Sequence, residues 1–286
     1  MKISVSSYSF SQYISQGKMT QLDAVSVAAE MGFEGIAFTE LRPCDKPTFE
    51  QQLEYARLIR EEAKIRGIEI SSYLVGADLS GDDGKEVERV KRQLDVAREL
   101  GAPVFRHDVC YKEKRNGVTV SFEQMLPTIA KNAREITEYA SGLGIITSSE
   151  NHGLVVQDSD RVERLYNAVS HENYGILLDI GNFACVDEDS VRAVSRLAPY
   201  AVHVHVKDFK KYPFGKDVPE GARCFNTRGC NKLVGCALGE GDIPVAQCLA
   251  IIKKAGYDGY LTVEYEGAED CLDGVRKGLE FLKNNA

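Results

Sequence analysis

The sequence lacks long apolar runs, low-complexity segments and the marks of a secretory leader. No stretch approaches the roughly 20 consecutive apolar residues that a membrane-spanning helix needs. The first ten residues are rich in serine and strand-like, without the apolar region and small-residue cleavage site of a signal peptide. We therefore expect a cytoplasmic protein with no membrane partner.

A dense stripe of lysine and arginine is also missing. The chain has 35 Lys and Arg against 43 Asp and Glu, which gives a formal net charge of -8. Proteins that bind a phosphate backbone normally present clustered cations, and the pair Lys210 and Lys211 is too small to form such a cluster. The sequence therefore predicts no nucleic-acid partner.

The eight cysteines lack the spacing of a metal-binding motif. Cys224, Cys230 and Cys236 share one segment, but no two cysteines in the chain have the two-residue gap that is common in zinc and iron-sulfur sites. In a chain of 286 residues without a secretory signal, reduced thiols are expected.

What the sequence does contain is a repeated alternation of strand-like and helix-like segments. Period-two and β-rich segments predict strands at 2–8, 34–38, 68–74, 104–107, 145–150, 175–180, 201–208 and 260–265. Helical spacing predicts helices at 19–31, 49–66, 84–100, 121–143, 158–170, 187–197, 243–255 and 269–283. Several predicted helices end at a glycine, as at Gly67 and Gly101.

Eight such units in a chain of this length favour one α/β domain over residues 1–286, folded as a closed (β/α)8 TIM barrel. The alternative is an open, doubly wound sheet. That fold would call for a phosphate-binding glycine turn after the first strand, and residues 6–10 contain no glycine.

The segment 201–208, Ala-Val-His-Val-His-Val-Lys-Asp, alternates strictly. It places His203, His205 and Lys207 on one face and three valines on the other. Polar groups on a buried strand face are unfavourable without partners, so a metal ion or a polar ligand is expected beside this face.

Other polar residues lie at the carboxyl ends of the neighbouring strands, where TIM barrels carry their active sites. Glu150, Asp179, His205 and Glu264 come from four consecutive predicted strands. Three carboxylates and one imidazole form a mainly hard donor set, which suits Mn²⁺ or Mg²⁺, with Co²⁺ or Zn²⁺ also possible. Each residue alone could equally be a solvated loop residue or a helix cap.

The motifs that extend these residues resemble a known family. They are Ser149-Glu150-Asn151-His152-Gly153, Leu178-Asp179-Ile180-Gly181-Asn182, His203-Val204-His205-Val206-Lys207-Asp208, Gly239-Glu240-Gly241-Asp242-Ile243, Ala255-Gly256-Tyr257-Asp258-Gly259-Tyr260 and Thr262-Val263-Glu264-Tyr265-Glu266. Together they resemble the xylose isomerase-like barrel superfamily, and within it the sugar phosphate isomerases and epimerases, with ketose 3-epimerases, hydroxypyruvate isomerases and inosose dehydratases.

The resemblance implies one divalent metal ion held by Glu150, Asp179, His205 and Glu264. It also implies that Glu150 and Glu264 lie on opposite sides of a keto sugar and exchange a proton with one carbon, while the metal binds neighbouring sugar oxygens. Lewis-acid polarisation of the carbonyl would lower the barrier to removing a C–H proton.

One position departs from the family pattern. Relatives often have a histidine shortly after the aspartate ligand, where this chain has Asn182. An amide can hydrogen-bond a sugar hydroxyl but does not titrate near neutral pH. His152, two residues beyond Glu150, either contacts substrate or supports the site through a hydrogen bond.

Further residues are expected near the site. We expect His203 to be a core histidine rather than a ligand, and Lys207 either to contact a substrate oxygen or to pair with a carboxylate such as Asp179. Arg106 and His107 must face opposite ways on their strand. We prefer His107 as the substrate contact because it lies nearer the rim.

Residues 209–238 form a connection too long for a simple turn. Its basic residues, which include Lys210, Lys211, Arg223 and Arg228, could receive a substrate phosphate or carboxylate, or could form a subunit contact in a homo-oligomer. Both a lid and an interface remain open.

These observations favour an isomerase or epimerase acting on a small keto sugar, sugar acid or cyclic polyol. A metal-dependent dehydratase of an inosose-like substrate is the nearest alternative, since loss of a hydroxyl would follow the same proton abstraction. A multi-zinc DNA repair endonuclease fits poorly, because the chain has 5 histidines and an acidic balance. A non-catalytic sugar-binding subunit would not need two opposed glutamates.

Overall fold

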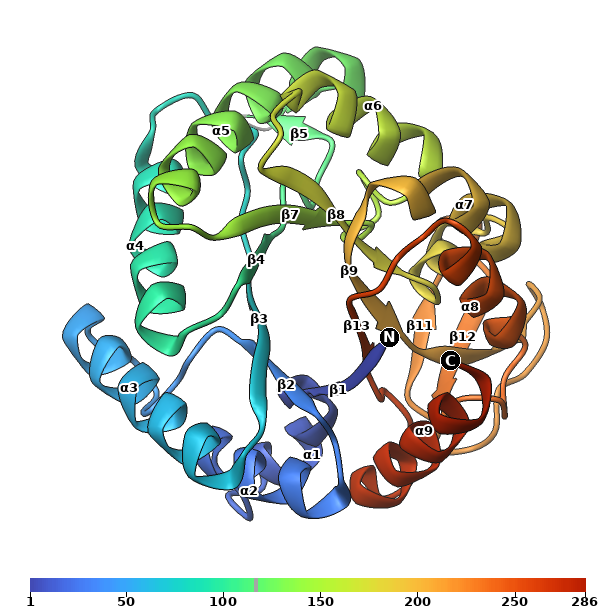
Figure 1. Ribbon diagram of the computed structural model, residues 1–286. Coiled ribbons are helices and arrows are strands. Elements are labelled where there is room, and N and C mark those ends of the chain that lie inside the picture. The colour runs from blue at the N-terminus through green and yellow to red at the C-terminus, as the bar shows by residue number, and fades with distance from the viewer. Residues whose placement is uncertain (116–117) are drawn as a thin grey trace.

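Eight parallel strands close into a barrel in the computed structural model, which describes residues 1–115 and 118–286 (Figure 1). The strands are β1 (Lys2–Ser6), β2 (Gly35–Thr39), β3 (Glu69–Val75), β4 (Val104–His107), β7 (Ile146–Glu150), β8 (Tyr174–Asp179), β9 (Ala201–Val206) and β13 (Tyr260–Val263). Around the barrel they run in chain order, and β13 pairs with both β9 and β1 to close it. This arrangement confirms the predicted (β/α)8 barrel.

Helices ring the barrel on the outside (Figure 1). They are α1 (Ser11–Ser15), α2 (Gln21–Met31), α3 (Phe49–Arg66), α4 (Lys85–Leu100), α5 (Phe122–Gly142), α6 (Ser159–Val169), α7 (Ser190–Leu197), α8 (Val245–Lys254) and α9 (Cys271–Asn285), with short 3-10 turns η1 (Ser7–Phe10), η2 (Asn182–Val186) and η3 (Ala198–Tyr200). No helix within the described ranges is both long and apolar enough to cross a membrane.

Local sequence signals set where these helices begin and end. The hydroxyl of Thr48 accepts from the backbone of Gln51, and the side chain of Gln51 accepts from the backbone N–H of Thr48. This reciprocal pair satisfies two amides that the first turn of α3 leaves without partners. The same helix ends at Gly67, whose φ of 67° is a left-handed conformation that glycine adopts without steric strain.

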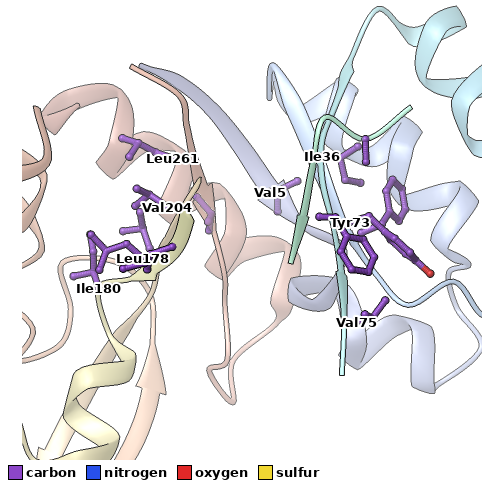
Figure 2. Close-up of a cluster of buried hydrophobic side chains, with 14 of the residues drawn as sticks. Val5, Ile36, Tyr73, Val75, Leu178, Ile180, Val204 and Leu261 are labelled. Atoms are coloured by element: carbon purple, nitrogen blue, oxygen red, sulfur yellow. The ribbon is translucent and has the colours of Figure 1, made fainter. Parts of the chain in front are cut away.

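Alternation along each strand separates two environments. Outward side chains such as Val5, Ile36, Val204 and Leu261 form the apolar layer between strands and helices (Figure 2). This layer supplies most of the buried apolar surface, and therefore most of the hydrophobic stabilisation.

Inward side chains are smaller and more polar. Nε2 of His203 lies 3.2 Å from the hydroxyl of Ser72, across the barrel, and 2.7 Å from that of Thr262. The hydroxyls of Ser4 and Thr262 lie 2.5 Å apart. Burial and the neighbouring His205 lower the pKa of His203, which is therefore neutral. His203 lies in the polar barrel interior, below the strand ends.

The long connection after β9 is folded. It contains an antiparallel sheet of β10 (Asp208–Tyr212), β12 (Lys232–Cys236) and β11 (Cys224–Asn226). This sheet was not predicted from the sequence. The strand before it was expected to extend to Asp208, whereas β9 ends at Val206. A second small ribbon, β5 (Lys114–Arg115) with β6 (Val118–Thr119), lies in the connection after β4 and was also not predicted.

Asp208 organises the chain that returns from this sheet. Its buried carboxylate accepts hydrogen bonds from the backbone amides of Phe209 (2.8 Å), Gly239 (3.0 Å), Gly241 (3.0 Å) and Ile243 (3.1 Å). A Cβ on Gly241 would lie 2.1 Å from Oδ1 of Asp208, so glycine is required for the backbone to come this close. The motif Gly239-Glu240-Gly241 is thus a binding loop for one aspartate.

Candidate active site

Four strand ends bring their polar side chains to one point at the rim of the barrel. Glu150 ends β7, Asp179 ends β8, His205 lies on β9, and Glu264 follows β13. One donor atom from each residue lies within 4.8 Å of the donor atoms of the other three, and all four residues are buried. The four residues expected to form the metal set are therefore brought together.

The backbone around Asp179 fixes the direction of its carboxylate. Oδ1 accepts from the amides of Gly181 (2.8 Å) and Asn182 (2.9 Å), which leaves Oδ2 facing the cluster. The side-chain amide of Asn151 also spans the main chain of Asp179, donating to its carbonyl and accepting from its N–H, both at 2.9 Å. These bonds hold the end of β8 in register with β7.

His205 is the one nitrogen donor in the cluster. Both its ring nitrogens are buried without a hydrogen-bond partner among the described residues. Nδ1 lies 3.4 Å from Oε1 of Glu264, 4.0 Å from Oε1 of Glu150 and 4.0 Å from Oδ2 of Asp179. A buried imidazole with no partner beside three carboxylates fits a divalent cation, because the ion would bind the nitrogen and balance the negative charge.

Two buried cations lie on either side of this cluster. Nη2 of Arg106 lies 2.5 Å from Oε2 of Glu150 and 2.7 Å from Oδ1 of Asp108. Nζ of Lys207 lies 2.5 Å from Oε2 of Glu264 and 3.0 Å from Oδ2 of Asp179. Each of the two glutamates therefore has its own cation.

These pairings shift the ionisation of the site. Burial alone would raise the pKa of Glu264, but Lys207 and His205 outweigh it and hold that pKa well below its usual range. Burial would lower the pKa of Lys207, but Asp179 and Glu264 raise it well above the ordinary value. Lys207 is therefore a permanent cation, and Glu264 is a carboxylate.

Asn182 and His152 complete the surroundings of Glu150. Nδ2 of Asn182 donates to Oε1 of Glu150 at 2.9 Å, so its amide contacts the glutamate directly. Nδ1 of His152 donates to Oδ1 of Asp108 at 2.9 Å, and the hydroxyl of Tyr111 donates to Oδ2 of Asp108 at 2.6 Å. The imidazole of His152 is thus oriented by a carboxylate that Arg106 also binds.

The orientation of β4 differs from the expectation. His107 is fully buried on the outer face, with its ring 6.3 Å from that of Phe105 and 6.5 Å from that of Tyr174, and Nδ1 lies 2.9 Å from the carbonyl of Asp108. Arg106 faces inward instead. The preference for His107 as the substrate contact is therefore reversed, because the bulky aromatic neighbours of the outer face accommodate an imidazole.

An open cavity of about 430 Å³ lies above the cluster. Its walls include Arg106, Glu150, His152, Lys207 and Glu264. Asp179 and His205, the other two members of the cluster, have no exposed surface. The volume falls in the range of small-molecule sites, and the walls combine two cations with several carboxylates.

Two further residues of this cavity, Tyr8 and Glu266, were not among the predicted site residues. Both continue a period of two that was visible in the sequence: Tyr8 follows Ser4 and Ser6, and Glu266 follows Glu264. Extending the alternation of inward-facing side chains beyond the last residue of each strand would have predicted both as site residues. Asn151 carried no such signal, because its role depends on a contact with the backbone of the next strand.

Comparison with known proteins identifies similar chains. Residues 25–285 match a family model described as xylose isomerase-like TIM barrel. The inosose dehydratase of Mesomycoplasma hyopneumoniae (strain 7448) is 22% identical over 277 residues, covering 91% of this chain and 87% of that protein. The L-ribulose-5-phosphate 3-epimerase UlaE of Escherichia coli (strain SMS-3-5 / SECEC) is 24% identical over 291 residues, covering 92% and 88%.

Among solved structures, the IOLI protein with a bound zinc atom superposes with a TM-score of 0.76 at 14% identity, over 99% of this chain and 97% of that one. At this identity the likeness shows the shared fold, and the chemistry must be argued from the residues themselves.

Proposed function

The chain belongs to the xylose isomerase-like TIM barrel family, and from that premise we propose that it is a divalent-metal-dependent isomerase or epimerase. Its substrate is a small keto sugar, sugar acid or cyclic polyol. The observation that carries the proposal is the pair of glutamates, Glu150 and Glu264. They belong to one buried cluster with a histidine that finds no hydrogen-bond partner within the described part of the chain.

Glu150, Asp179, His205 and Glu264 would hold the metal ion. Their donor set is mainly hard oxygen, which favours Mn²⁺ over softer ions and leaves Mg²⁺, Co²⁺ and Zn²⁺ as alternatives. The chemistry that such an ion supplies is Lewis-acid polarisation of a substrate carbonyl, which makes the adjacent C–H group more acidic.

The two glutamates then divide the proton transfer. Lys207 and His205 keep Glu264 in the carboxylate form, which is the form that can accept a proton from the carbon next to the carbonyl, and the same two groups lower its basicity. Glu150 approaches from the opposite strand of the cluster and returns a proton to the same or the neighbouring carbon. Removal and return on opposite faces give epimerisation, and transfer between neighbouring carbons gives isomerisation.

Other residues position the substrate in this proposal. Lys207, Asn182 and His152 offer an ammonium, an amide and an imidazole around the two glutamates, and each can hydrogen-bond a sugar hydroxyl. Arg106 replaces His107 in this group, because Arg106 lines the cavity and His107 does not.

Hydrogen exchange tests the mechanism. The purified protein with Mn²⁺ is incubated with keto sugars and inososes in deuterated water, and deuterium at a substrate carbon identifies the substrate and the site of proton transfer. Glu150→Gln and Glu264→Gln should each lower turnover by about 10² to 10⁴ while the protein stays folded.

Glu240→Gln is the matched control. Glu240 is a surface glutamate bound by Lys277 at 2.8 Å, outside the cluster, so its loss should leave turnover unchanged. Wild-type rates in both the Glu150→Gln and Glu264→Gln proteins would contradict the proton-transfer mechanism.

A dehydratase is the second candidate, and the His152 to Asp108 hydrogen bond favours it. An imidazole oriented by a carboxylate at the wall of the cavity could protonate a departing hydroxyl. The product decides between the two functions, because a dehydratase product has lost one water by mass and an epimerase product has the mass of the substrate.

A further inference from the structure

A second cavity adjoins the one above the metal cluster. Its volume is about 450 Å³, close to the 430 Å³ of the first, and the two share Tyr8 and Glu266 as wall residues. The far walls come from α1, from the segment after β13 and from Arg223 in the folded connection. A ligand that filled the first cavity would therefore have a polar space of equal size beside it.

Tyr265 forms one wall of this second cavity. Its side chain is 5% exposed, and its hydroxyl has no hydrogen-bond partner among the described residues. The ring fits between two glycines: a Cβ on Gly267 would lie 2.2 Å from the hydroxyl, and one on Gly274 would lie 2.3 Å from Cε2. The two glycines therefore hold the ring in a fixed position, and its hydroxyl is enclosed by the protein.

Arg223 is the charged donor in this cavity that is available to a ligand. Its guanidinium stacks on the ring of Phe225 at 5.4 Å. Within residues 1–115 and 118–286 it forms no ion pair, although Glu266 lines the same cavity. Stacking on an aromatic ring orients a guanidinium while leaving its N–H donors free.

The remaining lining defines the chemistry of the ligand. Ser11, Ser15 and Gln12 supply hydroxyl and amide groups, and the single cation, Arg223, is matched by the single carboxylate, Glu266. A phosphate dianion would face that carboxylate with only one cation to bind it. Hydroxyl and amide groups together with two tyrosine rings suit a neutral polyhydroxylated ring.

We propose that the second cavity is a subsite for a second sugar ring, so that the preferred substrate is a glycosylated keto sugar rather than a free monosaccharide. This inference rests on the proposed function, because it takes the first cavity as the place where the keto sugar reacts. The reacting unit lies over the metal cluster, and the glycosyl unit passes between Tyr8 and Glu266 toward Arg223.

Three ligands with the same keto sugar test the subsite. D-fructose, D-fructose 6-phosphate and isomaltulose, which is fructose with a glucosyl group on O6, differ only at that position. Their affinities for the Mn²⁺-loaded protein are measured by calorimetry. We expect isomaltulose to bind at least ~10-fold more tightly than fructose, and the phosphate to give no such gain.

A blocking variant and its control test whether the gain in isomaltulose affinity comes from the second cavity. Ser15 in the second cavity and Ser195 on α7 are both exposed, and each hydroxyl donates to the carbonyl three residues earlier, at 3.1 Å and 2.7 Å. Ser15→Trp should bring the affinity ratio of isomaltulose to fructose close to 1, while Ser195→Trp should leave it as in the wild type. Arg223→Gln, a milder change, should lower the ratio about threefold.

The subsite proposal would be overturned by equal affinities for fructose and isomaltulose, or by no measurable binding of isomaltulose. Tighter binding of fructose 6-phosphate than of isomaltulose would also overturn it, as would a gain in isomaltulose affinity that persists in Ser15→Trp. Failure of the proposed function has a different readout, since no deuterium would enter any of the three sugars while the affinity ratio could still be measured.

Discussion

Lys207 places its ammonium group between Asp179 and Glu264, two of the carboxylates that would hold a divalent cation. The two cations therefore repel each other when both are present. Lys207→Met should raise the affinity for Mn²⁺ by about tenfold or more, while lowering the stability of the metal-free protein by about 3 to 5 kcal/mol because two buried carboxylates lose their partner.

Calorimetric titration with Mn²⁺ and urea unfolding in a chelator measure the two effects. The control is Lys277→Met, which removes an exposed lysine that pairs with Glu240 and Glu269. An unchanged Mn²⁺ affinity in Lys207→Met would contradict a metal site at these carboxylates.

His107 gives a prediction about acid stability. Burial lowers its pKa from 6.5 to about 4, although the carbonyl and charge of Asp108 act in the other direction. Between these values the unfolded chain binds a proton that the folded chain does not. The folded state is therefore stabilised above pH 6.5, and about 3 kcal/mol of that stability is lost as the pH falls toward 4.

Urea unfolding from pH 8 to pH 4.5 measures this loss. In His107→Gln the decline through this window should be smaller by about 2 to 3 kcal/mol, since glutamine does not titrate there. His171→Gln is the control, because His171 is a partly exposed histidine whose Nδ1 accepts from the backbone N–H of Asn173 at 3.0 Å. An identical decline in wild type and His107→Gln would show that His107 titrates normally in the folded protein.

Single residues also show which features of the site can be predicted from the sequence and which cannot. Period-two alternation placed Glu150, Asp179, His205 and Glu264 at matching strand ends, and the structure brings these four together. The same alternation predicted that the side chains of Arg106 and His107 face opposite ways. It did not indicate which of the two faces the barrel interior. That choice depends on Glu150 beside Arg106 and on Tyr174 beside His107, which are contacts between distant segments.

At the scale of elements, strand and helix positions were largely predictable because each carries its own periodicity and cap. The sheet of β10, β11 and β12 was not. Its strands are short, and Asp208 at the start of β10 holds the returning chain through the three backbone amides of Gly239, Gly241 and Ile243. Such a contact has no local sequence pattern.

The loop around Asp208 yields a third prediction. Gly241→Ala should destabilise the protein by about 1 to 3 kcal/mol, because the new methyl group would meet Oδ1 of Asp208 at 2.1 Å and displace the loop. Gly142→Ala, within α5, meets nothing within 4 Å and should instead stabilise by about 0.5 to 1 kcal/mol through helix propensity.

Chemical unfolding of both variants gives the comparison. The two alanine substitutions add the same methyl group, so opposite signs isolate the role of the close approach to Asp208. Equal effects would mean that the loop shifts to accommodate the methyl group.

At the scale of the whole molecule, the metal site should contribute to stability. A ligand that binds only the folded state stabilises it by about 2.7 kcal/mol at one hundred times its Kd. For a chain of this size that corresponds to a rise in Tm of roughly 5 to 10 °C. Adding Mn²⁺ to chelator-treated protein should therefore raise the Tm by about this amount.

Asp179→Asn removes one charged donor and should abolish most of the rise, whereas Asp258→Asn, at a surface aspartate near the amino terminus, should preserve it. Differential scanning fluorimetry measures both. A rise of the same size in Asp179→Asn would place the bound ion elsewhere on the protein.

The closure of the barrel by β13 has a consequence for how the protein is made. β13 is the last barrel strand to leave the ribosome, and it both seals the sheet against β1 and leads directly into Glu264. A nascent chain that has reached only β9 has two open sheet edges and lacks one of the four donors. Completion of the fold and assembly of the proposed site are therefore one late event, and a partly synthesised chain lacks the complete cluster.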